Sequence, residues 1–177
     1  MAFRQILKFP DKRLREVSRP IAEVTDEVRV LASDLLDVMY DEPGIGLAAP
    51  QAGEAIRLVV VDTQWTEEGT EPDPLVLVNP EIQQSEGKLV WKEGCLSVPN
   101  FEAEVERAER VRLCARDLEG QEVAIDATGL LAVCLQHEVD HLDGILFIDR
   151  ISRLKRNLYT QRRKKQLRRE LEEQTGS

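Results

Sequence analysis

Apolar residues recur at helical spacing shortly after the start of the chain. Thr25 can cap a helix that runs from Asp26 to about Tyr40. The apolar positions of this helix are three, four and three residues apart and therefore share one face: Val28, Leu31, Leu35 and Val38. The pattern predicts an amphipathic helix packed against a core.

Two more helices are predicted in the C-terminal part of the chain. One runs from Gly129 to about Leu142, with Thr128 as its cap and Gly144 as its stop signal. The other begins at Ser152 and continues nearly to the end. Its apolar stripe is short, so we expect the first two turns to dock on the body and the remainder to project; the stripe consists of Ile151, Leu154 and Leu158.

Patterns typical of strands lie between the first two helices. Predicted strands cover residues 56–62, 75–80 and 82–92, and a hairpin joins residues 111–117 to 121–127. Residues 41–53 and 63–74 are rich in glycine, proline and polar residues and are predicted to be loops. The pattern predicts an α+β fold in which antiparallel sheets pack around the buried helix 129–142. We expect one domain over residues 1–177, with a C-terminal helix over residues 151–174.

Composition and charge narrow the class of protein. A chain of 177 residues that is 42% apolar can form a real hydrophobic core. Its longest apolar runs are too short to span a bilayer, and no apolar signal-peptide core follows the first methionine. We therefore expect a soluble, cytoplasmic protein, monomeric and without a membrane partner. The net charge of −9 argues against general affinity for nucleic acid.

The segment QHEVDHLDG (residues 136–144) places two possible metal ligands and a possible general base on the helix 129–142. His137 and His141 are four residues apart, so both imidazoles can bind one ion from one helix face. Glu138 lies about 100° around the helix, where it can act as a general base without binding the metal. The alternative is a helix with two ordinary histidines. That these are the only two histidines of the chain modestly favours a metal site.

The third metal ligand is not decided by spacing. Carboxylates and three cysteines are candidates, because no other histidine exists. Cys134 is more simply a small core residue of the same helix, and Cys114 belongs to a strand-like alternation. Cys95 lies between Gly94 and Leu96, where the backbone is free to aim a thiol, although that argument alone carries little weight. The cysteines are odd in number and unpatterned for disulfides.

Three motifs together resemble those of the peptide deformylase family: GIGLAAPQ (residues 44–51), EGCLSVP (93–99) and QHEVDHLDG (136–144). They occur in that family's order, and the resemblance covers roughly residues 3–170. The long C-terminal helix resembles the shorter bacterial form. This resemblance implies a hydrolase that removes the formyl group from the N-terminal formyl-methionine of new polypeptides.

The resemblance also implies a role for each matching residue. Cys95, His137 and His141 would bind the metal, with a water in the fourth position and Glu138 as base and acid. Gln51 and the backbone N–H of Leu96 would bind the formyl oxygen. Such donors suit a tetrahedral intermediate. Iron is the metal implied by the family, while zinc, nickel and cobalt remain chemically possible.

A pocket for the methionine side chain is implied as well. Its expected walls are Ile45, Trp91, Val133, Cys134 and His137. Gly44 and Gly46 would let the loop that carries Gln51 pass close to the substrate, and Glu93 would support the site through loop hydrogen bonds. Trp91 and Val133 could equally be plain core residues. The chain departs from the family pattern at Glu102, where many bacterial members carry an arginine, so how the peptide beyond methionine is held stays open.

The C-terminal helix is unusually basic. Residues 150–169 contain ten lysines and arginines and no acid. A solvated helix is one interpretation; the other is an arm that faces ribosomal RNA, with cations at Arg162, Arg163, Lys164, Lys165, Arg168 and Arg169. Two other functions compete with deformylation: a general metallopeptidase, and a ribosome-associated protein that has lost activity.

Overall fold

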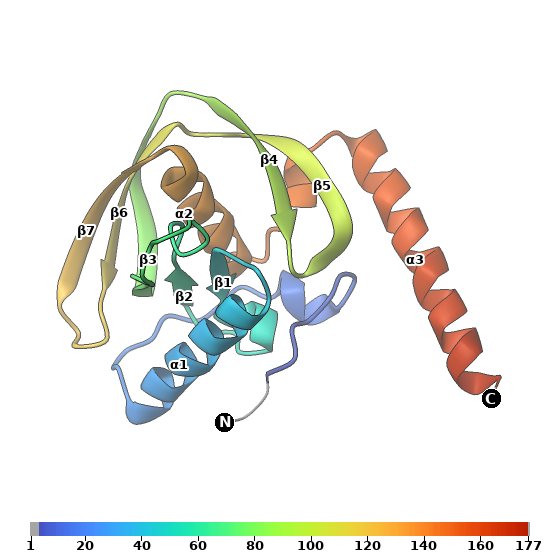
Figure 1. The fold of residues 1–177 in the computed structure, drawn as a ribbon, viewed down its shortest axis with the longest axis horizontal. Coiled ribbons are helices and arrows are strands. Elements are labelled where there is room, and N and C mark those ends of the chain that lie inside the picture. Colours follow the sequence, from blue (N-terminus) through green and yellow to red (C-terminus); the bar gives the residue numbers. More distant parts are fainter. Residues whose placement is uncertain (1–3, 177) are drawn as a thin grey trace.

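The computed structural model describes residues 4–176, and its strands form two antiparallel sheets (Figure 1). The larger sheet has the strand order β1-β2-β3-β6-β7, and β4 pairs only with β5. The strands are β1 (Gly46–Ala48), β2 (Leu58–Val61), β3 (Leu75–Glu86), β4 (Leu89–Cys95), β5 (Val98–Arg107), β6 (Arg110–Arg116) and β7 (Glu122–Thr128).

Three α-helices accompany the sheets: α1 (Asp26–Asp41), α2 (Gly129–Leu142) and α3 (Arg153–Thr175). Short 3₁₀ helices are η1 (Lys12–Arg15), η2 (Ala49–Ala52) and η3 (Phe147–Arg150). Helix α2 packs on one face of the larger sheet and α1 on the other. The β4-β5 hairpin arches over α2, and α3 descends along one side of the body (Figure 1). This arrangement confirms the predicted α+β fold around helix α2.

Strand β2 is apolar at every position because both of its faces are buried. Its four residues are fully buried. Val59 and Val61 pack toward α2, whereas Leu58 and Val60 pack toward α1, as alternation along a strand requires. Burying each such side chain contributes roughly 1.5–3 kcal/mol to the free energy of folding. The strand thereby fixes the position of α2, which carries the two histidines.

The structure corrects three of the predicted strand and loop assignments. The predicted loop 41–53 contains β1, because its backbone pairs with β2 at the sheet edge. The predicted strand 82–92 is two strands, since Gly87 adopts φ 71° and turns the chain between β3 and β4. Strand β5 was missed, although its buried and exposed residues alternate from Glu102 to Arg107.

The ends of the helices agree closely with the sequence pattern, with one exception. The Thr25 hydroxyl accepts a hydrogen bond from Val28 N at 3.4 Å, as a cap should. Thr128 precedes α2, but within residues 4–176 its hydroxyl makes no capping hydrogen bond. Gly129 adopts φ 60°, so the chain enters α2 through a glycine turn.

The docking face of α3 differs from the predicted stripe. Leu154 and Leu158 are 69% and 52% exposed, whereas Tyr159 and Arg163 are only 2% and 8% exposed. Tyr159 stacks on Phe101 with ring centroids 4.6 Å apart. The Arg163 Nε donates to the Phe9 carbonyl at 3.0 Å. Because an aromatic ring and a guanidinium form the contact, a search for aliphatic spacing missed it.

Among residues 4–176, none of the helices combines the length and the apolarity needed to cross a bilayer.

Candidate metal centre

Helix α2 directs its two histidines toward the same point. The ring centroids of His137 and His141 are 5.0 Å apart, and both side chains are buried. This is the geometry expected of residues one helical turn apart. Burial and the neighbouring His137 lower the pKa of His141 well below its ordinary value, so its imidazole is neutral and able to bind a metal.

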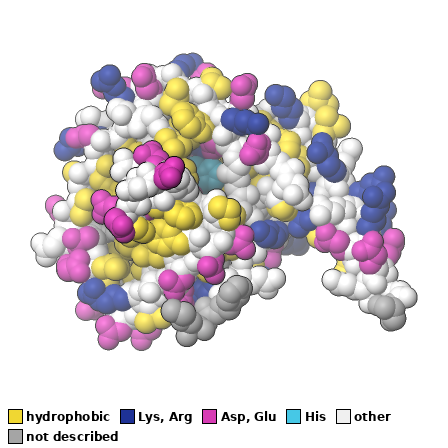
Figure 2. Space-filling model, viewed as in Figure 1, with side chains coloured by type: hydrophobic (Ala, Val, Ile, Leu, Met, Phe, Trp, Pro, Cys, Tyr) yellow, Lys and Arg dark blue, Asp and Glu magenta, His cyan; other side chains and the backbone are white. Residues whose placement is uncertain are grey.

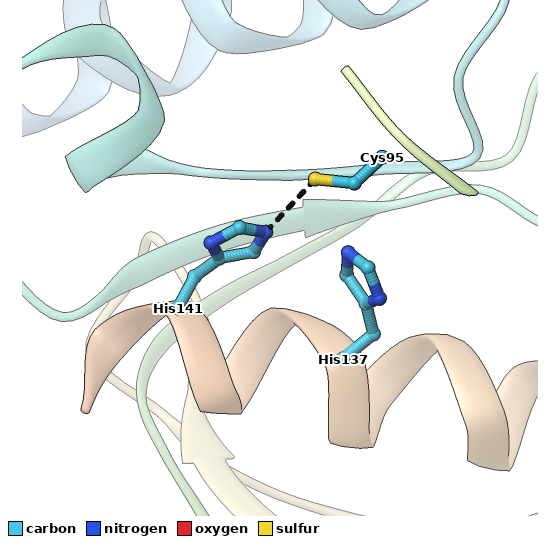
Figure 3. A group of neighbouring side chains, drawn as sticks. All are labelled: Cys95, His137 and His141. Atoms are coloured by element: carbon cyan, nitrogen blue, oxygen red, sulfur yellow. Dashed lines mark hydrogen bonds between the residues drawn. The ribbon is translucent and has the colours of Figure 1, made fainter. Parts of the chain in front are cut away.

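Cys95 reaches the same point from the end of β4. A register irregularity separates Gly94 from Cys95, and the next two residues turn the chain into β5. The Cys95 Sγ lies 3.3 Å from His141 Nε2 (Figure 3). Cys95, His137 and His141 each offer one ligand atom, and these atoms all lie within 4.8 Å of one another. The structure thus brings together the three candidate ligands implied by the family resemblance.

The donor set fits a divalent transition metal. One thiolate and two imidazoles are ligands typical of zinc and of softer first-row metals. A second observation supports the fit: Glu138 Oε2 is buried and has no hydrogen-bond partner among residues 4–176. A buried carboxylate oxygen without a partner is costly unless another group, such as an ion or its water, satisfies it.

Glu138 faces the centre from the pocket side of α2. Burial raises its pKa to about 7, although His137 acts in the opposite direction. A cation at the three ligands would favour the ionised carboxylate and lower this value. A Cβ at Gly46 would lie 2.7 Å from Glu138 Oε1, so only glycine lets the β1 backbone pass this carboxylate.

A carboxylate fixes the orientation of His137. Glu93 Oε1 lies 2.8 Å from His137 Nδ1, which leaves Nε2 for a metal. Arg107 holds the same carboxylate through Nε at 2.8 Å and a terminal nitrogen at 2.9 Å. Burial alone would raise the pKa of Glu93, but the hydrogen bonds from Arg107 and His137 prevail and lower it to about 2.

This buried charge network continues to the surface. Arg107 also donates to Asp140 Oδ2 at 2.6 Å, and Arg150 donates to both oxygens of Asp140 at 2.6 and 2.7 Å. Each buried charge is therefore paired, as burial requires. Glu93 contacts His137 of α2 and Arg107 of β5, whereas loop hydrogen bonds were expected of it. Arg107, Asp140 and Arg150 were not identified from the sequence.

Gln51 and Leu96 both lie next to Cys95, Gln51 through its side chain and Leu96 as the following residue of the chain. Gln51 belongs to η2, where its Oε1 accepts from Ala48 N at 2.9 Å. Its Nε2 donates to Ser97 Oγ at 3.1 Å and faces Cys95 Sγ at 3.6 Å. Leu96 occupies the turn after β4, and its carbonyl accepts from Lys8 Nζ at 2.6 Å. Both amide groups are thus held close to the thiol.

A pocket of about 750 Å³ opens onto this centre. In Figure 2 the histidine surface is visible in a hollow near the middle of the view. Every site residue expected from the sequence lines the pocket except His141, which lies buried behind it. The sequence argument missed Pro43, Lys92, Gly94, Val98, Asn100, Phe101 and Leu130.

Glu102 also lines this pocket, so the position where the chain departs from the family pattern faces the site. Its carboxylate lies 3.1 Å from Lys92 Nζ, and both side chains are exposed at the rim.

Known proteins share both the sequence and the fold. A family model described as polypeptide deformylase matches residues 3–157. The peptide deformylase of Alkalilimnicola ehrlichii is 54% identical over 97% of this chain and 90% of its own length. That of Rhodopseudomonas palustris strain BisB5 is 52% identical over 88% of this chain and 90% of its own length.

Two solved structures extend the comparison. A peptide deformylase from Legionella pneumophila superposes with a TM-score of 0.87 at 43% identity, covering 96% of this chain and 98% of that chain. The Ehrlichia chaffeensis peptide deformylase in complex with actinonin gives a TM-score of 0.87 at 37% identity, covering 94% and 98%. With its three motifs gathered at one centre, this chain belongs to the peptide deformylase family.

Proposed function

We propose that this chain, as one catalytic domain, removes the formyl group from N-terminal formyl-methionine of newly synthesised polypeptides and releases formate. One observation carries the proposal. The ligand atoms of Cys95, His137 and His141 converge within 4.8 Å, beside a pocket that the buried carboxylate of Glu138 also lines. Family membership supports the same reaction.

A divalent ion at this centre would lower the pKa of water to about 7 and polarise a carbonyl oxygen. Glu138 is the proposed proton carrier. Its carboxylate accepts a proton from the attacking water and later passes it to the amine nitrogen as the C–N bond breaks. The products are formate and a free N-terminal amine. A placed acid–base group typically contributes ~10²–10⁴ in rate.

Two donors are proposed for the formyl oxygen. The Leu96 N–H follows Cys95 directly, and Gln51 Nε2 lies 3.6 Å from the Cys95 thiol. Gln51 Nε2 donates to Ser97 Oγ at 3.1 Å and to Cys95 Sγ at 3.6 Å, so the formyl oxygen would replace the longer contact with sulfur. Donors fixed before the reaction stabilise the oxyanion without reorganisation.

The methionine side chain is assigned to the apolar part of the pocket. Ile45, Trp91, Val133, Cys134 and His137 all line it. An unbranched apolar side chain suits such walls. At the rim, Lys92 and Glu102 neutralise each other, so we expect little preference for charge in the residues that follow methionine.

A general metallopeptidase is the main competing function, because H-E-x-x-H helices are common in that class. Incubation with formyl-Met-Ala-Ser and with its acetylated analogue separates the two functions. We expect formate from the first peptide and no cleavage of the second. Cleavage of an internal peptide bond in either substrate would contradict deformylation as the main activity.

Ferrous iron is the proposed ion. The thiolate leaves one net positive charge on a divalent centre, and iron, cobalt, nickel and zinc all accept such ligands. Affinity order alone favours zinc over iron, so the preference rests on the resemblance to the family. Iron and the Cys95 thiolate are both oxidisable. Activity should therefore decay in air, and substitution by nickel or cobalt should preserve it.

Ribosome association through α3 is a further part of the proposal. The dark-blue side chains in Figure 2 follow the upper part of α3, away from the body. Five of the six cations named from the sequence are exposed in the middle part of α3: Arg162, Lys164, Lys165, Arg168 and Arg169. Arg163 is excluded from the proposed set, since it is buried against the Phe9 carbonyl.

Replacing these five cations by glutamine should weaken ribosome binding and flatten its dependence on salt, because fewer counterions are released from RNA. Hydrolysis of a free formyl-tripeptide should be unchanged. Binding can be measured by co-sedimentation with ribosomes at several salt concentrations. The matched control replaces Glu170, Glu172 and Glu173 of the same helix by glutamine, which should not weaken binding. Equal ribosome affinity for the five-cation variant and the wild type at low salt would rule out this anchor.

A further inference from the structure

Trp65 contacts one wall of the pocket without lining the pocket itself. The wall consists of Pro43, Gly44, Ile45 and Gly46, all of which line the pocket. The Trp65 indole Nε1 donates to the Gly44 carbonyl at 2.8 Å. The contact joins the pocket wall to the polar segment 63–74, in which Trp65 follows Gly44 by 21 residues.

Backbone hydrogen bonds hold part of the wall, because Gly46 pairs with Val61 and Asp62 N donates to the Ile45 carbonyl at 2.9 Å. The Gly44 carbonyl is held by Trp65. Two of the wall's four residues are glycines, which allow many more backbone conformations than other residues. Its position matters for the reaction. A Cβ at Gly44 would lie 3.4 Å from Leu96 Cδ1, and Gly46 passes directly beside Glu138. Movement of the wall would therefore change the shape of the pocket beside the Leu96 side chain and Glu138.

Trp65 is itself held firmly. Its ring meets Tyr40 edge to face, with centroids 5.1 Å apart and an angle of 84°. The buried Asp62 carboxylate accepts from the Tyr40 hydroxyl at 2.8 Å and from the backbone N–H groups of Trp65 at 3.2 Å and Asp73 at 2.9 Å. Asp62 thus forms hydrogen bonds near both ends of segment 63–74. These bonds hold the backbone at Trp65 in place while its indole contacts the wall.

We propose that Trp65 is a positioning residue that holds the Pro43–Gly46 wall in the shape that binds the formyl-methionine end of the substrate. The inference rests on the proposed function and assigns a role to segment 63–74. The wall contacts the substrate in the ground state and in the transition state alike. Loss of its support should therefore raise KM more than it lowers kcat.

Trp65→Phe is the test, because phenylalanine keeps a ring that can face Tyr40 while it removes the N–H donor together with part of the bulk of the indole. KM for formyl-Met-Ala-Ser should rise ~2- to 10-fold, the range expected for one hydrogen bond. The value of kcat should stay within about twofold of the wild type. Metal per chain should be unchanged, which separates positioning from damage to the centre. Thr66→Ala, at the exposed neighbouring position, is the matched control and should behave as the wild type.

Three outcomes would overturn the inference. The first is an unchanged KM in folded Trp65→Phe protein, and the second is a fall in kcat alone. If Trp65→Phe does not fold, Tyr40→Phe serves instead, because it removes only the hydroxyl bonded to Asp62. The third outcome that would overturn the inference is an unchanged KM in the Tyr40→Phe variant. A wild type that releases no formate would overturn the proposed function itself, and this inference with it.

Discussion

Glu138→Gln should lower kcat for formyl-Met-Ala-Ser at least ~10²-fold and leave the metal content per chain unchanged. Glutamine has nearly the same shape as glutamate, but it cannot accept a proton from water and return it to the amine. The metal should stay because the three converging ligand atoms belong to Cys95, His137 and His141. Removing a buried carboxylate of raised pKa also removes a desolvation penalty, so the variant should fold.

Formate release and elemental analysis on the same preparation provide the measurement for Glu138→Gln. Asp140→Asn is not a suitable control, because Asp140 pairs with the buried Arg107 and with Arg150. Glu102→Gln is better matched, as its carboxylate lines the same pocket at the exposed rim. It should retain kcat. Metal-loaded Glu138→Gln protein with wild-type kcat would assign the base to another group.

Cys95→Ser should bind metal far more weakly than the wild type and lose activity with it. A serine hydroxyl is neutral at pH 7, whereas the thiolate brings both a negative charge and a soft donor atom. Loss of an outer partner of a metal ligand typically costs 10–100-fold in affinity. Loss of a ligand atom should cost more than that. Chelator competition at fixed pH measures the change.

The other two cysteines are internal controls for this experiment. Cys134 is buried on α2, but its Sγ faces the Ile45 carbonyl at 3.6 Å, a contact that a serine hydroxyl can reproduce. Cys114 lies on β6, away from the group of three ligands. Cys114→Ser and Cys134→Ser should both retain metal. A centre emptied by Cys134→Ser but not by Cys95→Ser would show that the third ligand has been misassigned.

The parts of the site that are local in sequence were predictable. His137 and His141 are four residues apart in a helix, and this spacing alone places their rings together. The third ligand required the family resemblance, because Cys95 comes from the end of β4 and its position depends on how the β4-β5 hairpin arches over α2. Two other cysteines were equally possible by spacing. Only the fold distinguishes them.

The charge network behind the site shows a second limit. Arg107 occupies a buried position in the alternation of β5, and an inward-facing arginine in such a pattern indicates a buried acidic partner. That signal was present, but β5 itself was not recognised. The partners Glu93 and Asp140 lie 14 and 33 residues away, which no local pattern can reveal. The docking face of α3 was misjudged for a similar reason, since Phe101 and Phe9 decide it from other elements.

The most direct test of the account is formate release by one anaerobic preparation in three states: as purified, after metal removal by a chelator, and after ferrous iron is restored. We expect formate from formyl-Met-Ala-Ser in the first state, loss of activity in parallel with metal content in the second, and recovery in the third. Undiminished formate release by metal-free protein would contradict the claim that Cys95, His137 and His141 hold a catalytic ion.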